Sequence, residues 1–225
     1  MARKTRSRDR GERTRRRILE VAAELFAING YGETRLEDVA SRIGVQRAAL
    51  VYYFRSKQDL YDAVLGEAAG DLVGRIQEAL KAEAPLEERL ERMLDLWLEA
   101  VRERPWLARL LLRQVAGAAP NSEHSFASHG RHLIRVLEKA LGEGRSPAGL
   151  APIDAIHLVS VVAGATAFFV SGSPLIAPRK TFDPLAPRNL ARHRLQLLTI
   201  IRRLLGVEED QGPGGPRATR PRRRS

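Results

Sequence analysis

The feature that most constrains the fold is an apolar period of three and four residues that runs through nearly the whole chain. Ile18, Val21, Ala22 and Leu25 begin the first stripe, and similar stripes recur until about Leu205. The two-residue alternation of half-buried strands is missing between them. We therefore predict an all-α fold, in which 225 residues suffice for one large domain or two small ones.

Gly, Pro and Ser separate the helical stripes. A first helix is expected at about 12–28, because Asn29-Gly30 ends a helix in the left-handed conformation. Loops are predicted at 117–125, 142–152 and 172–187. After Gly206 the composition is typical of a disordered tail.

Positive charge is concentrated at the two ends. Residues 1–17 hold nine Lys or Arg and two acidic residues, and residues 217–225 hold five Arg, whereas the stretch between them is near neutral. Basic ends on a neutral globule are typical of a chain that meets a polyanion. For the carboxyl-terminal run, a tail that only aids solubility remains an alternative.

Composition excludes several protein classes. The chain has no Cys, which excludes a disulfide framework and a thiolate metal site and fits a reducing cytoplasm. Its amino terminus leads into no uninterrupted apolar run, so we expect no secretory signal. The most apolar stretch, 158–170, is shorter than the ~20 residues of a membrane span, so no membrane association is expected.

Residues 35–54 have the spacing of a helix-turn-helix unit. Ala40 is small where the two helices would touch, Gly44 stands at the turn, and Leu50 is apolar inside the second helix. Only a small side chain allows the close crossing, and glycine enters the left-handed region at little cost. Two such short helices are unstable alone, so we expect them to pack on the first helix as a three-helix unit.

Two sequence signals predict helix starts around this unit. Thr34 and Glu37 are spaced as a capping box, which would begin a helix at Arg35. Ser56 and Asp59 are spaced in the same way and predict the start of the next helix.

The amino-terminal 65 residues resemble the DNA-binding domain of the tetracycline-repressor (TetR/AcrR) family of bacterial regulators. The residues that carry the resemblance are Ile18 to Ala22, Leu25-Phe26, Gly30-Tyr31, Thr34, Val39-Ala40, Ile43 to Val45, Leu50, Tyr53-Phe54, Ser56-Lys57 and Leu60. The rest of the chain matches only in being helical and of the right length.

The resemblance implies that residues 46–53 form a recognition helix in the major groove of DNA and that Lys57 holds a phosphate. Side-chain chemistry agrees, because Arg47 can bind a guanine edge with two hydrogen bonds and alanines can touch a thymine methyl. Helix starts favour phosphate contacts. The candidate DNA-binding residues are Thr34, Arg35, Gln46, Arg47, Ala48, Ala49, Tyr52, Tyr53 and Lys57.

Three positions depart from the usual family pattern. Gln46, Ala48 and Val51 stand where Ser, Gly and Tyr are common, which leaves the operator sequence open but not DNA binding. Tyr52 can supply the missing hydroxyl. Tyr52 and Tyr53 contact DNA in one interpretation and only fill the three-helix core in the other, whereas Phe54 continues the core stripe.

We expect four segments along the chain. These are a basic disordered arm at 1–11, the helix-turn-helix domain of the TetR type at 12–64, a larger helical domain at 65–206, and a disordered basic tail at 207–225. The basic residues of 1–17 can follow the phosphate backbone or enter the minor groove.

The second domain is expected to bind an effector and to dimerise. Its aromatic residues line a ligand cavity, as the resemblance implies, or merely fill a core. The candidate pocket residues are Met93, Trp97, Trp106, Leu110, Phe126, Phe168 and Phe169. Because 153–171 is apolar nearly all round, it needs cover from its own domain and from a partner. The candidate dimer residues are Ile153, Ser160, Gly164, Phe168, Leu197, Ile201 and Leu204.

Two other patterns give little support for a metal site or a catalytic site. His124, His129 and His132 lack the carboxylates of a metal site, and Asp154, His157 and Ser160 share one helix without a nucleophile elbow. We therefore expect no catalytic site, no bound metal and no cofactor beyond an unknown small-molecule effector.

The sequence thus predicts a ligand-responsive repressor that binds a palindromic operator on double-stranded DNA as a homodimer, with a small, largely apolar effector. The alternatives are a constitutive DNA-binding protein without effector and an activator of the same fold. An enzyme or carrier with incidental basic tails is a third class, which the missing catalytic motifs oppose.

Overall fold

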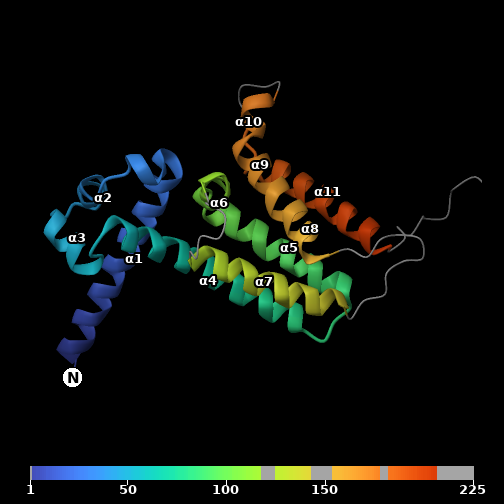
Figure 1. Ribbon diagram of the computed structural model, residues 1–225, viewed down its shortest axis with the longest axis horizontal. Helices are drawn as coiled ribbons and strands as arrows, with labels where there is room; N and C mark the ends of the chain where they lie inside the picture. The colour runs from blue at the N-terminus through green and yellow to red at the C-terminus, as the bar shows by residue number, and fades with distance from the viewer. Residues whose placement is uncertain (1, 118–124, 143–153, 178–181, 207–225) are drawn as a thin grey trace, which may run out of the picture.

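The computed structural model describes residues 2–117, 125–142, 154–177 and 182–206. Across these ranges the chain is helical without any strand, which confirms the all-α prediction (Figure 1). The helices are α1 (Ala2–Glu33), α2 (Leu36–Ile43), α3 (Arg47–Tyr53), α4 (Lys57–Lys81), α5 (Leu86–Glu103), α6 (Trp106–Gly117), α7 (Ser125–Gly142), α8 (Ala155–Val159), the π-turn η1 (Ser160–Gly164), α9 (Ala165–Ser171), α10 (Ser173–Ile176) and α11 (Pro187–Leu205).

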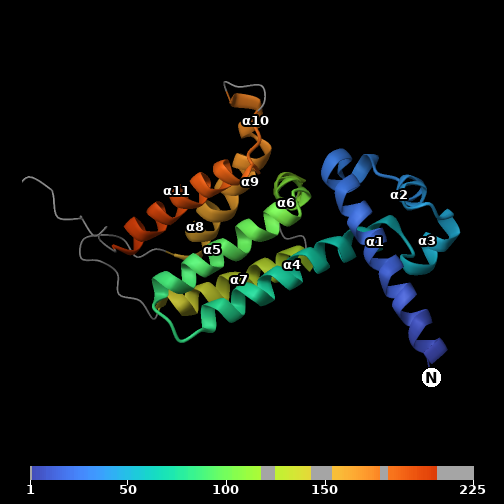
Figure 2. The same cartoon turned by 180° about the vertical axis from the view of Figure 1, so that it is seen from behind.

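Buried side chains form two separate clusters. The amino-terminal cluster joins α1, α2, α3 and the first turns of α4, with Phe26, Leu50 and Leu60 almost completely buried. The second cluster joins the rest of α4 with α5 to α9 and α11. The two clusters lie at opposite ends of α4, which runs from one to the other (Figure 2).

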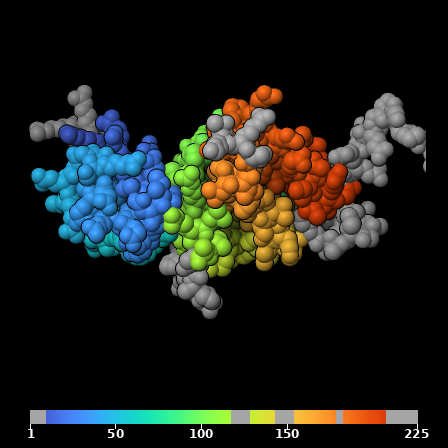
Figure 3. All heavy atoms as spheres, turned by 90° about the horizontal axis from the view of Figure 1, so that it is seen from above, coloured from blue at the N-terminus to red at the C-terminus, as the bar shows by residue number. Residues whose placement is uncertain are grey.

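Helix α6 lies where the two clusters meet. Its Leu110 is buried in the amino-terminal cluster, its Leu107 is buried in the second, and Trp106 packs against both. Figure 3 shows this green segment between the blue amino-terminal helices and the orange and red helices. A displacement of α6 would therefore disturb both clusters.

Helix α1 is longer than predicted at both ends. It begins at Ala2 rather than near Glu12, so the backbone of 2–11 is helical where we expected a disordered arm. The segment has no proline and is rich in Arg, a good helix former, which explains the extension. At the other end Gly30 breaks the helical geometry with a φ of 85°, as expected for Asn29-Gly30. The first turns of α1 project beyond α4 (Figure 1).

Ion pairs join α11 to α5. The guanidinium of Arg194 donates to the Asp95 carboxylate at 2.5 Å and to Glu91 at 2.6 Å, and Arg202 donates to Glu87 at 2.6 Å. These carboxylates raise the pKa of Arg194 above its ordinary value. Within the described ranges, none of the helices is long and apolar enough to cross a membrane.

Candidate nucleic-acid interface and ligand cavity

The turn between α2 and α3 is built by Gly44. Its φ of 76° and ψ of 34° are left-handed, and its N–H donates to the Ser41 carbonyl at 3.1 Å while that of Val45 donates to Ala40 at 3.0 Å. A Cβ at Gly44 would meet no atom within 4 Å, so the backbone conformation, rather than crowding, favours glycine here. Buried Ala40 and Leu50 then hold the two helices together, as the sequence pattern predicted.

The predicted capping box is displaced by one residue. Arg35, not Thr34, is the N-cap of α2, and its N–H donates to the carboxylate of Asp38 at 3.1 Å. Thr34 is only 1% exposed, and its hydroxyl lies 2.7 Å from the Gly30 carbonyl and 3.3 Å from that of Leu25. The prediction that the Thr34 hydroxyl caps α2 is therefore wrong, because the hydroxyl bonds the end of α1, and a phosphate contact at Thr34 stays a prediction.

Helix α3 presents an almost fully exposed surface. Of its seven residues only Leu50 is buried, while Tyr52 is 85% exposed. The N-cap Gln46 and the side chains of Arg47, Ala48 and Ala49 are also exposed. Tyr53 is half-buried and packs against the amino-terminal cluster, with its ring edge-on to Tyr52 at 5.4 Å. The structure thus assigns Tyr53 partly to the core and leaves Tyr52 on the surface.

Arg47 has an exchangeable partner. Its Nε lies 2.8 Å from the Glu37 carboxylate of α2, and both side chains are more than half exposed. An exposed pair of this kind contributes only ~0–1 kcal/mol, so a stronger partner can replace Glu37. Arg35 is exposed at the start of α2 on the same small unit.

Lys57 has a contact that the sequence did not predict. Its ammonium donates to the carbonyls of Tyr31 at 2.8 Å and Gly32 at 3.0 Å and lies 4.5 Å from the Tyr31 ring centroid. Ser56 accepts from the Asp59 N–H at 3.0 Å and caps α4 as predicted. Lys57 therefore fixes the start of α4 against the end of α1, and one of its three N–H donors remains for another acceptor.

Polar contacts also join α6 to the amino-terminal helices. Arg113 donates to the carbonyls of Ala27 at 2.9 Å and Ile28 at 2.6 Å, near the end of α1. Tyr61 of α4 donates to Gln114 at 2.8 Å. Burial, with Asp62 second, raises the pKa of Tyr61, which therefore remains a neutral donor.

A small apolar cavity of about 190 Å³ lies in the second cluster. It is lined by Ala68, Ala69, Leu72, Val73, Ile76, Met93, Trp97, Leu107, Leu111, His129, Gly130, Leu133, Val159, Val162 and Ala163. Small residues on α4, α7 and η1 leave the space that larger neighbours enclose. Sequence reasoning missed most of this lining, since periodicity marks a buried face but not a gap in it.

Only some of the predicted pocket residues line this cavity. Met93 and Trp97 do, whereas Trp106, Leu110, Phe168 and Phe169 lie elsewhere in the structure. Leu110 and Trp106 are used where the clusters meet, Phe168 is 56% exposed, and Phe169 stacks on His193 with ring centroids 4.2 Å apart. The side chain of Phe126 lies outside the described residues.

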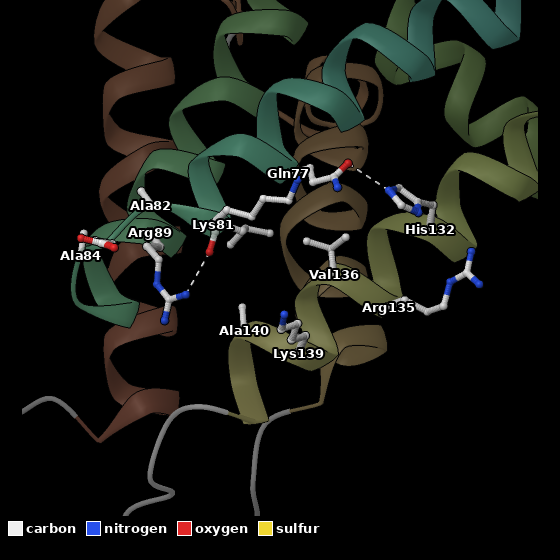
Figure 4. A pocket seen from close by; sticks show the side chains of 12 residues that line it. Gln77, Lys81, Ala82, Ala84, Arg89, His132, Arg135, Val136, Lys139 and Ala140 are labelled. Atoms are coloured by element: carbon white, nitrogen blue, oxygen red, sulfur yellow. Dashed lines mark hydrogen bonds between the residues drawn. The ribbon is translucent and has the colours of Figure 1, made fainter.

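A larger depression of about 780 Å³ is open and polar. It lies between the end of α4, the following turn and α7 (Figure 4). Lys81, Arg89, His132, Arg135 and Lys139 line it, with a hydrogen-bond contact of 3.0 Å between His132 and Gln77. With four Lys or Arg against one acidic residue, Glu83, the lining has a net positive charge, in contrast with the apolar cavity farther along α4 and α7.

The predicted dimer residues separate into two groups. Leu197 and Ile201 are 2% and 1% exposed within one protomer, so their assignment to a dimer surface is wrong. The face of α11 that carries them packs into the second cluster, and periodicity could not say which partner covers it. Ser160 and Gly164 are exposed, as are Phe168 and Leu204 at 56% and 38%. Ile153, like His124 and the 207–225 tail, lies outside the described residues.

The pattern of Asp154, His157 and Ser160 is structural. Asp154 caps α8, accepting from the N–H of His157 at 2.9 Å, and lies 2.5 Å from its Nδ1. The Ser160 hydroxyl donates to the Ile156 carbonyl at 2.8 Å rather than to the imidazole. Among the side chains that the structure describes, no three His, Asp or Glu residues gather as metal ligands.

Comparisons with known proteins agree with the geometry. Residues 18–64 match the profile of the bacterial regulatory proteins of the tetR family. The HTH-type transcriptional regulator RutR of Escherichia coli (strain K12) is 29% identical over 159 residues, which are 71% of this chain and 74% of RutR.

Solved structures share the fold. The transcriptional regulator FadR of Bacillus subtilis in complex with stearoyl-CoA is 18% identical, with a TM-score of 0.64 over 85% of this chain and 98% of that one. The ketosteroid transcriptional regulator KstR2 of Mycobacterium tuberculosis is 20% identical, with a TM-score of 0.60 over 86% and 93%. The profile match over residues 18–64 confirms the resemblance seen in the amino-terminal sequence, and the solved structures confirm the fold.

Proposed function

Because its amino-terminal residues match the tetR family, we propose that this chain is a DNA-binding transcription regulator that represses by occupying a palindromic operator as a homodimer. A small, largely apolar effector in the second domain would release the DNA. The observation that carries the proposal is α3, a short helix held by one buried residue, Leu50, with the rest of its surface free to enter a major groove.

The exposed residues of α3 have distinct roles in this proposal. Arg47 leaves Glu37 to bind a guanine edge, and Ala48 and Ala49 contact a thymine methyl or the edge of a neighbouring base. Gln46 and Tyr52 add polar contacts, with Tyr53 positioning Tyr52. Arg35 and the remaining donor of Lys57 bind phosphates, together with the basic residues of α1.

The surface of α8, α9 and α11 supports a twofold dimer. Ile156, Ser160, Gly164 and Phe168 recur every four residues along one exposed side. On α11, Ile200 and Leu204 are 41% and 38% exposed and lie four residues apart on one side of the helix. Apolar side chains gathered in this way mark a protein interface. The same surface of a second copy would cover them and present two recognition helices to two half-sites.

Helix α6 can carry the effector signal. Its Leu107 and Leu111 line the apolar cavity, and Arg113 and Gln114 on the same helix hold α1 and α4. An occupant that favours one position of α6 would therefore favour one position of the amino-terminal helices. A tenfold loss of operator affinity requires ~1.4 kcal/mol of difference between the two positions.

The test starts from the DNA upstream of the gene itself. Footprinting should protect one discrete palindrome, and fluorescence anisotropy should show affinity that falls steeply with salt. Protection of no discrete site would contradict the operator proposal and favour non-specific binding. A double Ile156→Arg, Phe168→Arg variant should sediment as a monomer and lose operator affinity. A monomeric wild type that binds the full palindrome would contradict the dimer.

A further inference from the structure

Trp97 of α5 has an unmet donor inside the protein. Its side chain is 8% exposed, and its indole Nε1 is buried without a hydrogen-bond partner among the residues that the structure describes. An unsatisfied buried donor costs ~1–3 kcal/mol, and few occur per hundred residues in native proteins. This donor therefore calls for an acceptor.

The same indole lines the apolar cavity. Leu72, Ile76 and Met93 are among its aliphatic neighbours, and none of the described lining residues is Lys, Arg, Asp or Glu. A charged ligand group would lose its hydration there, where His129 is the single ionisable side chain of the described lining. The lining thus favours a neutral molecule, whereas an anion would prefer the open cationic groove of Figure 4.

The volume limits the size of the occupant. A dry cavity of ~150 Å³ accommodates benzene, so about 190 Å³ admits a molecule a few atoms larger. A molecule as large as an acyl-CoA does not fit within this volume.

We propose that the cavity binds a neutral, compact ligand of about eight or nine non-hydrogen atoms, mainly apolar and with one carbonyl or similar acceptor that accepts from Trp97 Nε1–H. This inference rests on the proposed effector function and names the chemistry of its ligand. Apolar contacts supply most of the affinity, and the single hydrogen bond selects ketones, esters and amides over hydrocarbons of the same shape.

Two probes of one shape test the hydrogen bond. Acetophenone carries a carbonyl where α-methylstyrene carries a methylene group. The chain has two tryptophans, so the ¹⁵N-labelled full chain gives two indole N–H resonances, which a Trp106→Phe variant assigns. Acetophenone should shift the Trp97 resonance downfield, whereas α-methylstyrene should perturb it without the downfield shift of a new hydrogen bond.

A variant then separates the donor from the packing. Trp97→Phe should weaken acetophenone about fivefold, the value of one net hydrogen bond, and leave α-methylstyrene within about twofold. The ratio of wild-type to variant affinity is compared between the two probes, because the hydration of each free probe is the same in both measurements and cancels in its ratio. Trp106→Phe is the matched control and should alter neither affinity beyond twofold.

Several results would overturn the inference. Equal weakening of both probes by Trp97→Phe would reduce Trp97 to a packing role. Binding of acetophenone with an unchanged Trp97 resonance would place the ligand elsewhere, and binding of neither probe would reject this ligand class. If Trp97→Phe fails to fold, the wild-type resonances alone decide.

Operator release is measured separately. Acetophenone bound at Trp97 without any effect on the operator complex would support the ligand chemistry and contradict the effector function. Release of DNA by a ligand that leaves the Trp97 resonance unperturbed would support the effector function and contradict the ligand chemistry.

Discussion

Both regions bury a threonine hydroxyl that is hydrogen-bonded, Thr34 in one and Thr166 in the other, but among the described residues the buried polar atoms without partners lie in the second. In the amino-terminal cluster, Thr34 is buried and its hydroxyl lies within hydrogen-bond distance of two carbonyls. In the second domain, Trp97 Nε1 and Ser171 Oγ are buried without partners among the described residues, and Trp97 lies beside a cavity. The amino-terminal cluster holds the exposed surface of α3 in a fixed shape, whereas the second region contains a cavity and a donor without a partner.

The junction between the regions is polar and specific. Lys57 and Arg113 come from different helices, yet both donate to carbonyls near the end of α1. A Cβ at Gly30 would lie 3.0 Å from the Arg113 guanidinium, and φ there is already left-handed. Small movements of α6 are thus transmitted to a point where α1 has little freedom.

The largest effect should come from creating a cavity in the amino-terminal cluster. Leu50→Ala removes a side chain with 0% exposure and should lower the free energy of unfolding by ~3–5 kcal/mol, with loss of DNA binding. Met93→Ala is the matched truncation at the cavity and should cost at least ~1 kcal/mol less, because Met93 already lacks neighbours on one side. Denaturant titration followed by circular dichroism measures both, and equal losses would remove the contrast between the clusters.

The next largest effect should come from charged residues on the surface of the amino-terminal helices, and it concerns operator affinity. Arg47→Ala should cost ~1–3 kcal/mol of operator affinity and relax selection at one base position in each half-site. Lys57→Ala should weaken all DNA sequences alike and lower the salt slope by about one. Anisotropy with single-base operator variants distinguishes them. Glu37→Gln is the control that frees Arg47 and should keep selectivity. Unchanged selectivity in Arg47→Ala would show that α3 does not read the bases.

Local sequence rules predicted what local contacts decide. Gly44, Leu50 and the Ser56 cap lie as expected, because turn geometry and helix periodicity involve only near neighbours. Lys57 escaped prediction because its partner carbonyls lie 26 and 25 residues earlier in the chain, where only the fold brings them near. Thr34 was misassigned although its partner Gly30 is only four residues away, because its hydroxyl bonds the end of α1 rather than the start of α2.

The same limit applies to the second domain. A stripe on α11 says that Leu197 and Ile201 are covered but not whether by their own chain or by a partner. The cavity depends on which small residues of α4, α7 and η1 face each other, and no spacing in the sequence records that.

Removing the Thr34 hydroxyl from the amino-terminal cluster should cost more stability than removing the Trp97 indole N–H from the cavity wall. Thr34→Val keeps the shape but removes a donor, which leaves the Gly30 carbonyl short of a partner, so we expect a loss of ~1–2 kcal/mol of stability. Trp97→Phe removes a donor that already lacks a partner, so its cost is limited to the lost ring contacts. Denaturant midpoints of the two variants compare them. A neutral Thr34→Val would mean that water satisfies this carbonyl equally well.

The smallest effect should come from two glycines on α4. A Cβ at Gly70 would lie 3.3 Å from Nε2 of His129, whereas at Gly74 it would meet nothing within 4 Å. Both Ala variants gain up to ~1 kcal/mol of helix propensity, so this gain cancels when they are compared.

What remains after that comparison is the contact with His129, which lines the cavity. Gly70→Ala must displace the imidazole by a few tenths of an ångström, so we expect the effector concentration for half-release of operator to change about threefold, a difference of ~0.6 kcal/mol. Gly74→Ala should leave that concentration unchanged, and both variants should bind operator like the wild type without effector. Release curves measured side by side decide the matter. If both variants change the half-release concentration by the same factor, the stiffness of α4 rather than the shape of the cavity sets the response. If neither variant changes it, the His129 side chain moves aside without altering the balance between the two positions of the amino-terminal helices.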